Sequence, residues 1–273
     1  NVIERPLCSV ITNIGLDHMR ELGDTVEKIA AEKAGIIKKG CPTVIYELPE
    51  NILAVISERC AEMSSPLTAA DFSAISEISD SRHGQVFSYK KYDNLKLPLL
   101  GLHQTKNAAV ALETVEVLRS QGFRISDEAV RAGLNATQWP ARFEILSENP
   151  FFIVDGGHNP QGAETVVDNL RRYFPCMKTV LLFGVLADKD YMGLARILNF
   201  VADEFVTITP QNPRALPSKE LAEALKSFGK RVTDCGDIES GIKTAIEHAG
   251  EDGVVCSVGS LYTAGPVRAY FGK

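Results

Sequence analysis

The sequence predicts an α/β fold organised as two domains, and three observations support this prediction. The chain has 273 residues, which is long enough for two domains of ordinary size with a core each. From residue 151 onward, strand patterns alternate with helix patterns, as in a parallel sheet covered by helices. Ahead of that region, residues 67–100 form short alternating runs that indicate antiparallel hairpins. We therefore expect one domain over residues 1–143 and a second over residues 144–273.

Composition and charge exclude several classes of protein. Hydrophobic residues make up 45% of the chain and charged residues 23%, as in soluble globular proteins. The formal net charge of −6 argues against nucleic-acid binding, although an acidic surface can still hold a basic pocket for an anionic ligand. No apolar run approaches the ~18 residues of a membrane span, and no signal-peptide pattern opens the chain. The six cysteines have no CxxC spacing, so we expect reduced residues of a cytoplasmic protein.

The first domain alternates strands and helices before its hairpins. Gly15 should end the first apolar strand, and Asp24 with Glu27 has the spacing of a capping box that begins the first helix at about Thr25. His83 falls in a turn signal between hairpin strands, where a surface position is the natural interpretation. The expected elements, in order, are a strand over 7–14, a helix over 25–35, a strand over 41–46, a helix over 49–63, hairpins over 67–100 with turns at 82–84 and 92–94, and helices over 101–122 and 126–137.

Lys33 is an unusual residue in the first expected helix. Four residues after Ile29, it falls on the face that Val26, Ile29 and Ile36 share, and this face should be buried. A desolvated lysine becomes a neutral, nucleophilic amine that could take up carbon dioxide as a carbamate and then ligate a metal beside His18. Alternatively, the side chain extends along its stem to solvent. The helix pattern alone leaves both interpretations open.

The alternating strand and helix patterns of the second domain predict a parallel sheet with helices on both faces. Ligands of such sheets bind at the carboxyl ends of the strands, so the loops that follow strands are the candidates for chemistry. The expected strands cover residues 151–154, 179–183, 205–209, 231–233 and 254–258, and the clearest helices between them cover 217–228 and 238–249.

Three loops after these strands carry polar residues and glycines. Residues 155–162 place Gly156 and Gly157 before a helix that Asn159 should cap, with Pro160 at its first position, which is a ready site for an anion. Residues 183–190 contain Asp-Lys-Asp, where Lys189 either meets an anionic group or forms a local ion pair with its neighbours. Residues 258–265 contain Gly-Ser-Leu-Tyr, where Ser260 is either a ligand contact or a helix cap.

The ordered set of motifs resembles one enzyme family. The motifs are Thr-Asn-Ile-Gly-Leu-Asp-His at 12–18, Glu-Lys-Ala-Gly-Ile-Ile at 32–37, Gly-Leu-His-Gln-Thr-Lys-Asn-Ala at 101–108, Trp-Pro-Ala-Arg at 139–142, Asp-Gly-Gly-His-Asn at 155–159 and Gly-Ser-Leu-Tyr at 259–262. Together they resemble folylpolyglutamate synthase and dihydrofolate synthase, within the Mur ligase superfamily. The resemblance implies part of a central ATPase domain followed by a Rossmann-like domain. It also implies an ATP-dependent ligase that joins glutamate to folate or dihydropteroate through an acyl phosphate.

The resemblance also implies roles for individual residues. His18 would ligate magnesium, and a carbamylated Lys33 would support a second magnesium. Asn107, Arg142 and Asp155 would contact ATP, while His158 and Ser260 would lie near the incoming glutamate. Lys33, Asp155 and His158 would thereby be the residues that take part in catalysis. The implied partners are small molecules only, with no nucleic acid and no membrane, and we expect the full-length form to be a monomer.

The chain departs from the family pattern in a few places. Ala141 replaces a glycine, Gly157 replaces an alanine, and Val258 replaces a threonine. No Gly-x-x-x-x-Gly-Lys-Ser/Thr loop occurs in the sequence. The resemblance implies that the phosphate loop and most of the pterin site lie ahead of Asn1, and we expect these residues alone to be inactive. A Mur-type peptidoglycan ligase and a non-catalytic nucleotide-binding module remain alternatives.

Overall fold

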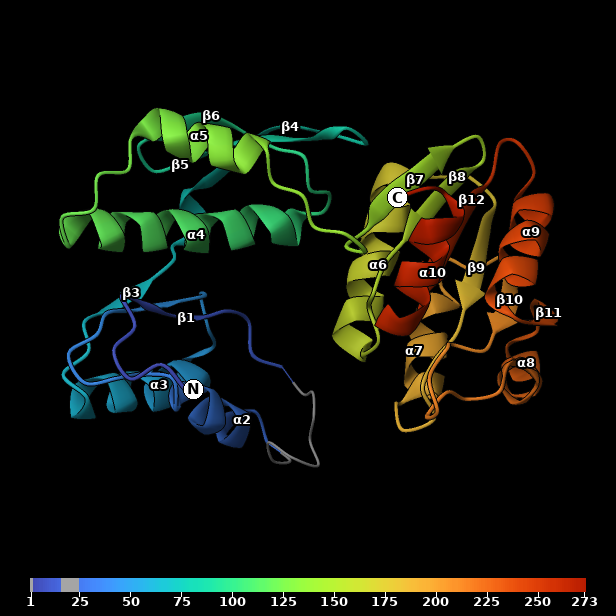
Figure 1. The fold of residues 1–273 in the computed structure, drawn as a ribbon, viewed down its shortest axis with the longest axis horizontal. Coiled ribbons are helices and arrows are strands. Elements are labelled where there is room, and N and C mark those ends of the chain that lie inside the picture. The colour runs from blue at the N-terminus through green and yellow to red at the C-terminus, as the bar shows by residue number, and fades with distance from the viewer. Residues whose placement is uncertain (1, 16–24) are drawn as a thin grey trace. The chain divides into compact units, whose positions relative to one another are not determined.

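The computed structural model describes residues 2–15 and 25–273, and these residues form two units (Figure 1). Unit 1 holds the described residues up to Pro98 together with Leu102–Thr137, and unit 2 holds Leu99–Gly101 and Gln138–Lys273. Each unit has its own sheets, helices and hydrophobic core, so the predicted α/β class is confirmed. Within the described ranges, no helix combines the length and the apolar character that crossing a membrane requires.

Unit 1 contains a small parallel sheet in the order β1-β2-β3, with β1 (Ser9–Ile11), β2 (Thr43–Ile45) and β3 (Leu67–Ala69). The first strand is shorter than predicted because only three of its residues pair with β2. Helices α2 (Val26–Ala34) and α3 (Glu50–Glu62) follow β1 and β2, and both match the predicted ranges. The apolar residues of these two helices and of the first two strands form one core with Ile29, Val44 and Ile56 at its centre.

Helix α2 differs from the prediction in its cap and in its buried face. Thr25 is the N-cap, and its hydroxyl accepts a hydrogen bond from the Lys28 N–H at 3.3 Å; Asp24 lies outside the described residues. The buried residues are Ile29, Ala30 and Ala34, whereas Lys33 is exposed. Of the two interpretations of Lys33 that the helix pattern left open, the structure shows the one in which the side chain is exposed to solvent.

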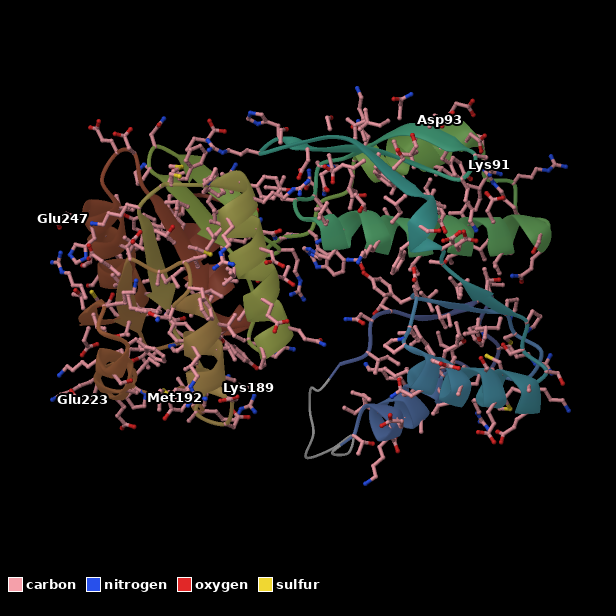
Figure 2. All side chains as sticks on the ribbon, turned by 180° about the vertical axis from the view of Figure 1, so that it is seen from behind. Lys91, Asp93, Lys189, Met192, Glu223 and Glu247 are labelled. Carbon is pink, nitrogen blue, oxygen red and sulfur yellow. The ribbon has the colours of Figure 1, made fainter. Side chains whose placement is uncertain are left out.

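Antiparallel strands form the second sheet of unit 1, with β4 (Ile75–Ser81), β5 (Gly84–Tyr89) and β6 (Tyr92–Leu97) after the short helix η1 (Phe72–Ala74). The predicted turn at 82–84 is present. The second turn lies at Lys90 and Lys91, two residues earlier than predicted, and Lys90 adopts a left-handed φ of 50°. Lys91 and Asp93 mark this end of the hairpin (Figure 2). The prediction was wrong because asparagine favours turns in general, while here Asn94 lies inside β6.

The two further helices of unit 1 agree with their predicted ranges. Helix α4 covers Leu102–Ser120, and α5 covers Asp127–Asn135 with Ser126 as its N-cap. The Glu113 carboxylate of α4 is buried and accepts a hydrogen bond from the Tyr89 hydroxyl at 2.7 Å. This bond ties α4 to the hairpin sheet.

Unit 2 contains one sheet of six strands in the order β11-β10-β9-β12-β8-β7 (Figure 1). The five predicted strands are present and mutually parallel, and the register of β12 between β8 and β9 is continuous. An antiparallel strand, β7, was not predicted and pairs with β8 at the edge. The bounds are β7 (Glu144–Glu148), β8 (Phe151–Val154), β9 (Thr179–Phe183), β10 (Glu204–Ile208), β11 (Arg231–Gly236) and β12 (Val254–Val258).

Helices cover both faces of this sheet. Leucines and valines of α6, α7 and α8 share a core with one face, and residues of α9 and α10 share a second core with the other face. The helices are α6 (Pro160–Tyr173), α7 (Tyr191–Leu198), α8 (Ser218–Leu225) continued by η2 (Lys226–Phe228), α9 (Ile238–Ala249) and α10 (Leu261–Tyr270). The chain inserts β12 between β8 and β9, so the strand order reverses there. The carboxyl ends of β8 and β12 are consequently the favoured place for a ligand.

Candidate functional site

Four of the predicted site residues lie together in unit 2. Asp155 and His158 follow β8, Ser260 follows β12, and Arg142 lies just before β7. Strands β8 and β12 are neighbours in the sheet, and their carboxyl ends lie on the same edge. The backbone N–H of Asp155 donates to the Ser257 carbonyl at 2.9 Å, which continues the pairing of the two strands into the loops.

Asp155 is the centre of this arrangement. Its carboxylate is buried, and it accepts hydrogen bonds from the backbone N–H groups of Gly157 at 2.6 Å and Phe143 at 2.8 Å. Burial raises the pKa of Asp155 above its ordinary value, while these two N–H donors, together with the nearby Arg142 and His158, lower it in part. The carboxylate therefore links the loop after β8 to the loop before β7.

The glycines after Asp155 allow a close approach of three loops. The Gly156 N–H donates to the Ala141 carbonyl at 2.9 Å, and the Gly157 carbonyl accepts from the Gly259 N–H at 2.9 Å. A side chain at Gly156 would collide with Leu261. The loop before β7, the loop after β8 and the loop after β12 are thus joined by backbone hydrogen bonds.

His158 has one ring nitrogen engaged by the backbone. Its Nδ1 lies 3.0 Å from the Gly156 carbonyl oxygen, which can only accept, so Nδ1 carries the hydrogen in this arrangement. Asn159 caps α6 as predicted, because its side-chain oxygen accepts from the Gly162 N–H at 2.8 Å.

Ser260 has a structural role in this unit. It is buried, and its hydroxyl caps α10 by accepting from the Tyr262 N–H at 3.2 Å. Gly259 before it has a φ of 106°, and a Cβ there would lie 2.6 Å from the Gly184 carbonyl oxygen. The helix-cap alternative for Ser260 is therefore present, and the predicted contact with glutamate stays a prediction.

Arg142 lies between two residues in a strained conformation. Ala141 has a φ of 58° and Phe143 a φ of 45°, values that non-glycine residues seldom adopt. The Arg142 guanidinium carbon lies 5.7 Å from the centre of the Trp139 ring, in a cation–π arrangement. Ala141 occupies the position where the family has glycine, and its positive φ gives the physical reason for that glycine.

The Asp-Lys-Asp loop does not form the local ion pair that sequence reasoning considered. Asp188 pairs with Arg214 at 3.1 Å, and Asp190 caps α7 through the Gly193 N–H at 2.9 Å. Lys189 lies beside the start of α7 near Met192 (Figure 2). Both carboxylates thus have partners other than Lys189.

The remaining predicted site residues belong to the first part of the chain. Asn107 lies in α4 and donates from its side-chain nitrogen to the Gln104 side-chain oxygen at 3.0 Å. His18 lies outside the described residues, so its predicted metal role is not addressed by the structure. In the part of the chain that the structure describes, no cluster of three histidine, cysteine or carboxylate side chains could hold a metal ion.

Sequence reasoning missed two residues that hold the loop before β7. The Glu144 carboxylate accepts from the Ala141 N–H at 2.8 Å and from the Arg268 Nε at 3.0 Å. Glu144 follows the Trp-Pro-Ala-Arg motif almost directly, which was the available signal. Arg268 lies more than a hundred residues later and had no signal of its own.

Comparison with known proteins identifies both parts of the chain. Residues 2–115 match the family model of the Mur ligase middle domain, and residues 141–261 match that of the Mur ligase, glutamate ligase domain. The chain is 34% identical to the dihydrofolate synthase/folylpolyglutamate synthase of Bacillus subtilis over 98% of its length. It is 35% identical to the folylpolyglutamate synthase of Lacticaseibacillus casei, also over 98%. It spans 63% and 62% of the lengths of these two relatives.

Solved structures give the same result. The folylpolyglutamate synthase of Mycobacterium tuberculosis, complexed with ADP and AMPPCP, superposes with a TM-score of 0.88 at 31% identity, over 100% of this chain and 65% of that one. An Escherichia coli FolC structure in complex with DHPP and ADP superposes with a TM-score of 0.82 at 29% identity, over 97% of this chain and 61% of that one. The chain belongs to the Mur ligase family, in the branch of the folylpolyglutamate synthases and dihydrofolate synthases.

Proposed function

We propose that this chain is part of an ATP-dependent ligase that adds glutamate to folate or dihydropteroate. The γ-phosphoryl group of ATP passes to a substrate carboxylate, which releases ADP and gives an acyl phosphate. The neutral amine of glutamate then attacks the acyl carbon, an amide bond forms, and inorganic phosphate leaves. Relatives of the same family carry these activities in their names, and two of their solved structures hold ADP.

The observation that carries the proposal is the arrangement around Asp155. A buried carboxylate, an arginine and a histidine meet at the strand edge where ligands of such sheets bind. Arg142 suits a phosphate group because its planar guanidinium offers parallel donors. His158, which follows β8, and Ser260, at the start of α10, stand on neighbouring loops and are assigned to the glutamate side.

Asn107, Arg142 and Asp155 are each assigned to the nucleotide, as the family motifs that contain them imply. Magnesium would be held by His18 and by carbamylated Lys33, and when bound it would offset charge on the phosphoryl oxygens. For Lys33 this role rests on family resemblance, because the burial that would favour a carbamate is not found in α2.

The test is an assay of glutamate incorporation by the complete gene product that contains these residues. With MgATP and either folate or dihydropteroate, we expect transfer of labelled glutamate and one ADP for each amide formed. Arg142→Ala should raise the KM for ATP by about tenfold to a hundredfold, as expected for a lost hydrogen bond to a charged group. Arg196→Ala in α7 is the matched control, because Arg196 is exposed and lies away from Asp155 in the chain.

Two results would contradict the proposal. ATP hydrolysis without amide formation on either pteridine substrate would exclude the reaction. An unchanged KM for ATP in Arg142→Ala would exclude the role given to that arginine.

A further inference from the structure

The loop of Arg142 is held in place by an acidic residue outside the family motifs, Glu144. We propose that Glu144, itself held by Arg268, is the positioning residue that fixes Arg142 for the nucleotide. This inference rests on the proposed function, because it assigns Glu144 a task only if Arg142 contacts ATP.

The backbone around Arg142 needs external support. Ala141 and Phe143, on either side of it, both have positive φ values, of 58° and 45°. A non-glycine residue does not hold such a conformation unless the surroundings determine it. Without support, the two flanking residues would relax toward negative φ and would carry the arginine side chain to another place.

Glu144 supplies the support on the first side of the loop. Its carboxylate accepts from the Ala141 N–H at 2.8 Å, three residues back along the chain. Asp155 supplies the support on the second side, because its carboxylate accepts from the Phe143 N–H at 2.8 Å. The two residues with positive φ are thus each bonded to a different carboxylate, and Arg142 lies between the two anchors.

Arg268 fixes the Glu144 carboxylate in turn. The Arg268 Nε donates to the same oxygen, Oε2, at 3.0 Å, and both side chains are about three-quarters buried, with exposures of 27% and 24%. Arg268 lies in the last turn of α10, the helix that Ser260 caps. The pair therefore connects the helix of the glutamate-side residue Ser260 with the loop of the nucleotide-side residue Arg142.

Trp139 reports on this loop directly. It is the single tryptophan of these 273 residues, and the Arg142 guanidinium lies over its ring. In Glu144→Ala, we expect a shift of the Trp139 emission maximum and an increase in its quenching by acrylamide, because the loop loses its first anchor. Glu148→Ala is the matched control, since Glu148 lies at the other end of β7 and is exposed. An emission spectrum and a quenching constant equal to those of the unsubstituted chain would overturn the inference.

Kinetics of the complete gene product provide the second readout. We expect Glu144→Ala to raise the KM for ATP by about tenfold, as a displaced binding group does, with a smaller change in kcat. Glu144→Gln should retain most of the affinity for ATP, because its amide oxygen can still accept from the Ala141 N–H. In the double variant with Arg142→Ala, the substitution of Glu144 should add nothing further, because it acts through Arg142.

The outcomes separate this inference from the proposed function. If Arg142→Ala raises the KM for ATP and Glu144→Ala does not, the positioning role is wrong and the proposed function stands. If Arg142→Ala has no effect on the KM, the proposed contact of Arg142 fails, and the positioning role fails with it. If Glu144→Ala lowers the melting temperature and kcat but leaves the KM for ATP and the Trp139 signal unchanged, Glu144 is merely structural.

Discussion

Asp155 experiences two opposite influences on its charge. Burial in unit 2 disfavours the carboxylate, whereas the N–H groups of Gly157 and Phe143 favour it, and burial is the larger influence on its pKa. A carboxyl group whose pKa is raised on folding stabilises the protein relative to its uncharged replacement at low pH. That contribution is complete below the ordinary pKa of 3.8 and is lost as the pH rises through the higher pKa of the folded state.

We therefore predict that the stability difference between the unsubstituted chain and Asp155→Asn depends on pH. The free energy of unfolding of the unsubstituted chain should fall relative to that of Asp155→Asn as the pH rises above about 4. Urea unfolding over a series of pH values measures this difference. Asp237→Asn is a control of opposite sign, because hydrogen bonds from Ser240 lower the pKa of Asp237. The stability of the unsubstituted chain relative to Asp237→Asn should increase as the pH rises from below the ordinary pKa of Asp237. A constant difference for Asp155→Asn would contradict the prediction.

At the scale of residues, the sequence could predict side chains that belong to a local motif. Asp155, His158 and Ser260 were predicted separately, and the structure brings them together because β8 and β12 are neighbours. The anchoring of Arg142 could not be predicted. Positive φ values at an alanine and a phenylalanine leave no trace in composition or spacing, and the bond between Glu144 and Arg268 joins residues that are distant in the chain.

At the scale of elements, α6 depends on its cap. Asn159 accepts from the Gly162 N–H, and Pro160 occupies the first turn, so the helix starts at a defined residue directly after the candidate site. The helix then buries Ala163, Val166 and Leu170 against the sheet. The start of α6 thus fixes both a part of the core and the loop that holds His158.

Loss of this cap should destabilise unit 2. We predict that Asn159→Ala lowers the free energy of unfolding by about 1 kcal/mol, the usual cost of a lost N-cap. Asn159→Asp should keep the stability, because a carboxylate accepts the same N–H and interacts favourably with the helix dipole. Urea unfolding followed by circular dichroism measures both variants. Equal losses in the two variants would show that the cap bond is not responsible.

Elements whose apolar residues recur at a regular spacing were predicted. A strand that depends on pairing at the edge of a sheet, and the path of a long flexible side chain, were not. Helices α3, α5 and α9 follow from apolar residues at helical spacing, and Ser126 and Asp237 cap the last two. Strand β7 was missed because it is half-exposed at the edge of the sheet, where alternation is weak. For Lys33 the helical period left a buried and an exposed side chain open, because a lysine stem is long enough to leave the direction that the period gives it.

At the scale of the whole molecule, the chain combines two units with different sheets. Unit 1 has a parallel and an antiparallel sheet of three strands each, and unit 2 has one sheet of six strands. The change in pattern from short alternating runs to regular alternation of strands with helices predicts two domains, over residues 1–143 and 144–273, and these bounds stay a prediction.

Because the two units have separate cores, a cavity made in one unit should destabilise that unit and leave the other largely unchanged. Ile56 is fully buried in the core of unit 1, and Leu181 is fully buried in the core of unit 2. Ile56→Ala and Leu181→Ala should each cost about 2–5 kcal/mol, since each removes buried methyl groups from a packed core. Amide hydrogen exchange should show lost protection in α2 and α3 for the first variant and in β9 and β12 for the second, with little change in the other unit. Glu58→Ala, at an exposed position of α3, is the control and should leave protection unchanged. Equal loss of protection in both units from either cavity would show that the chain unfolds as one cooperative body, and the division into two units would then have no energetic meaning.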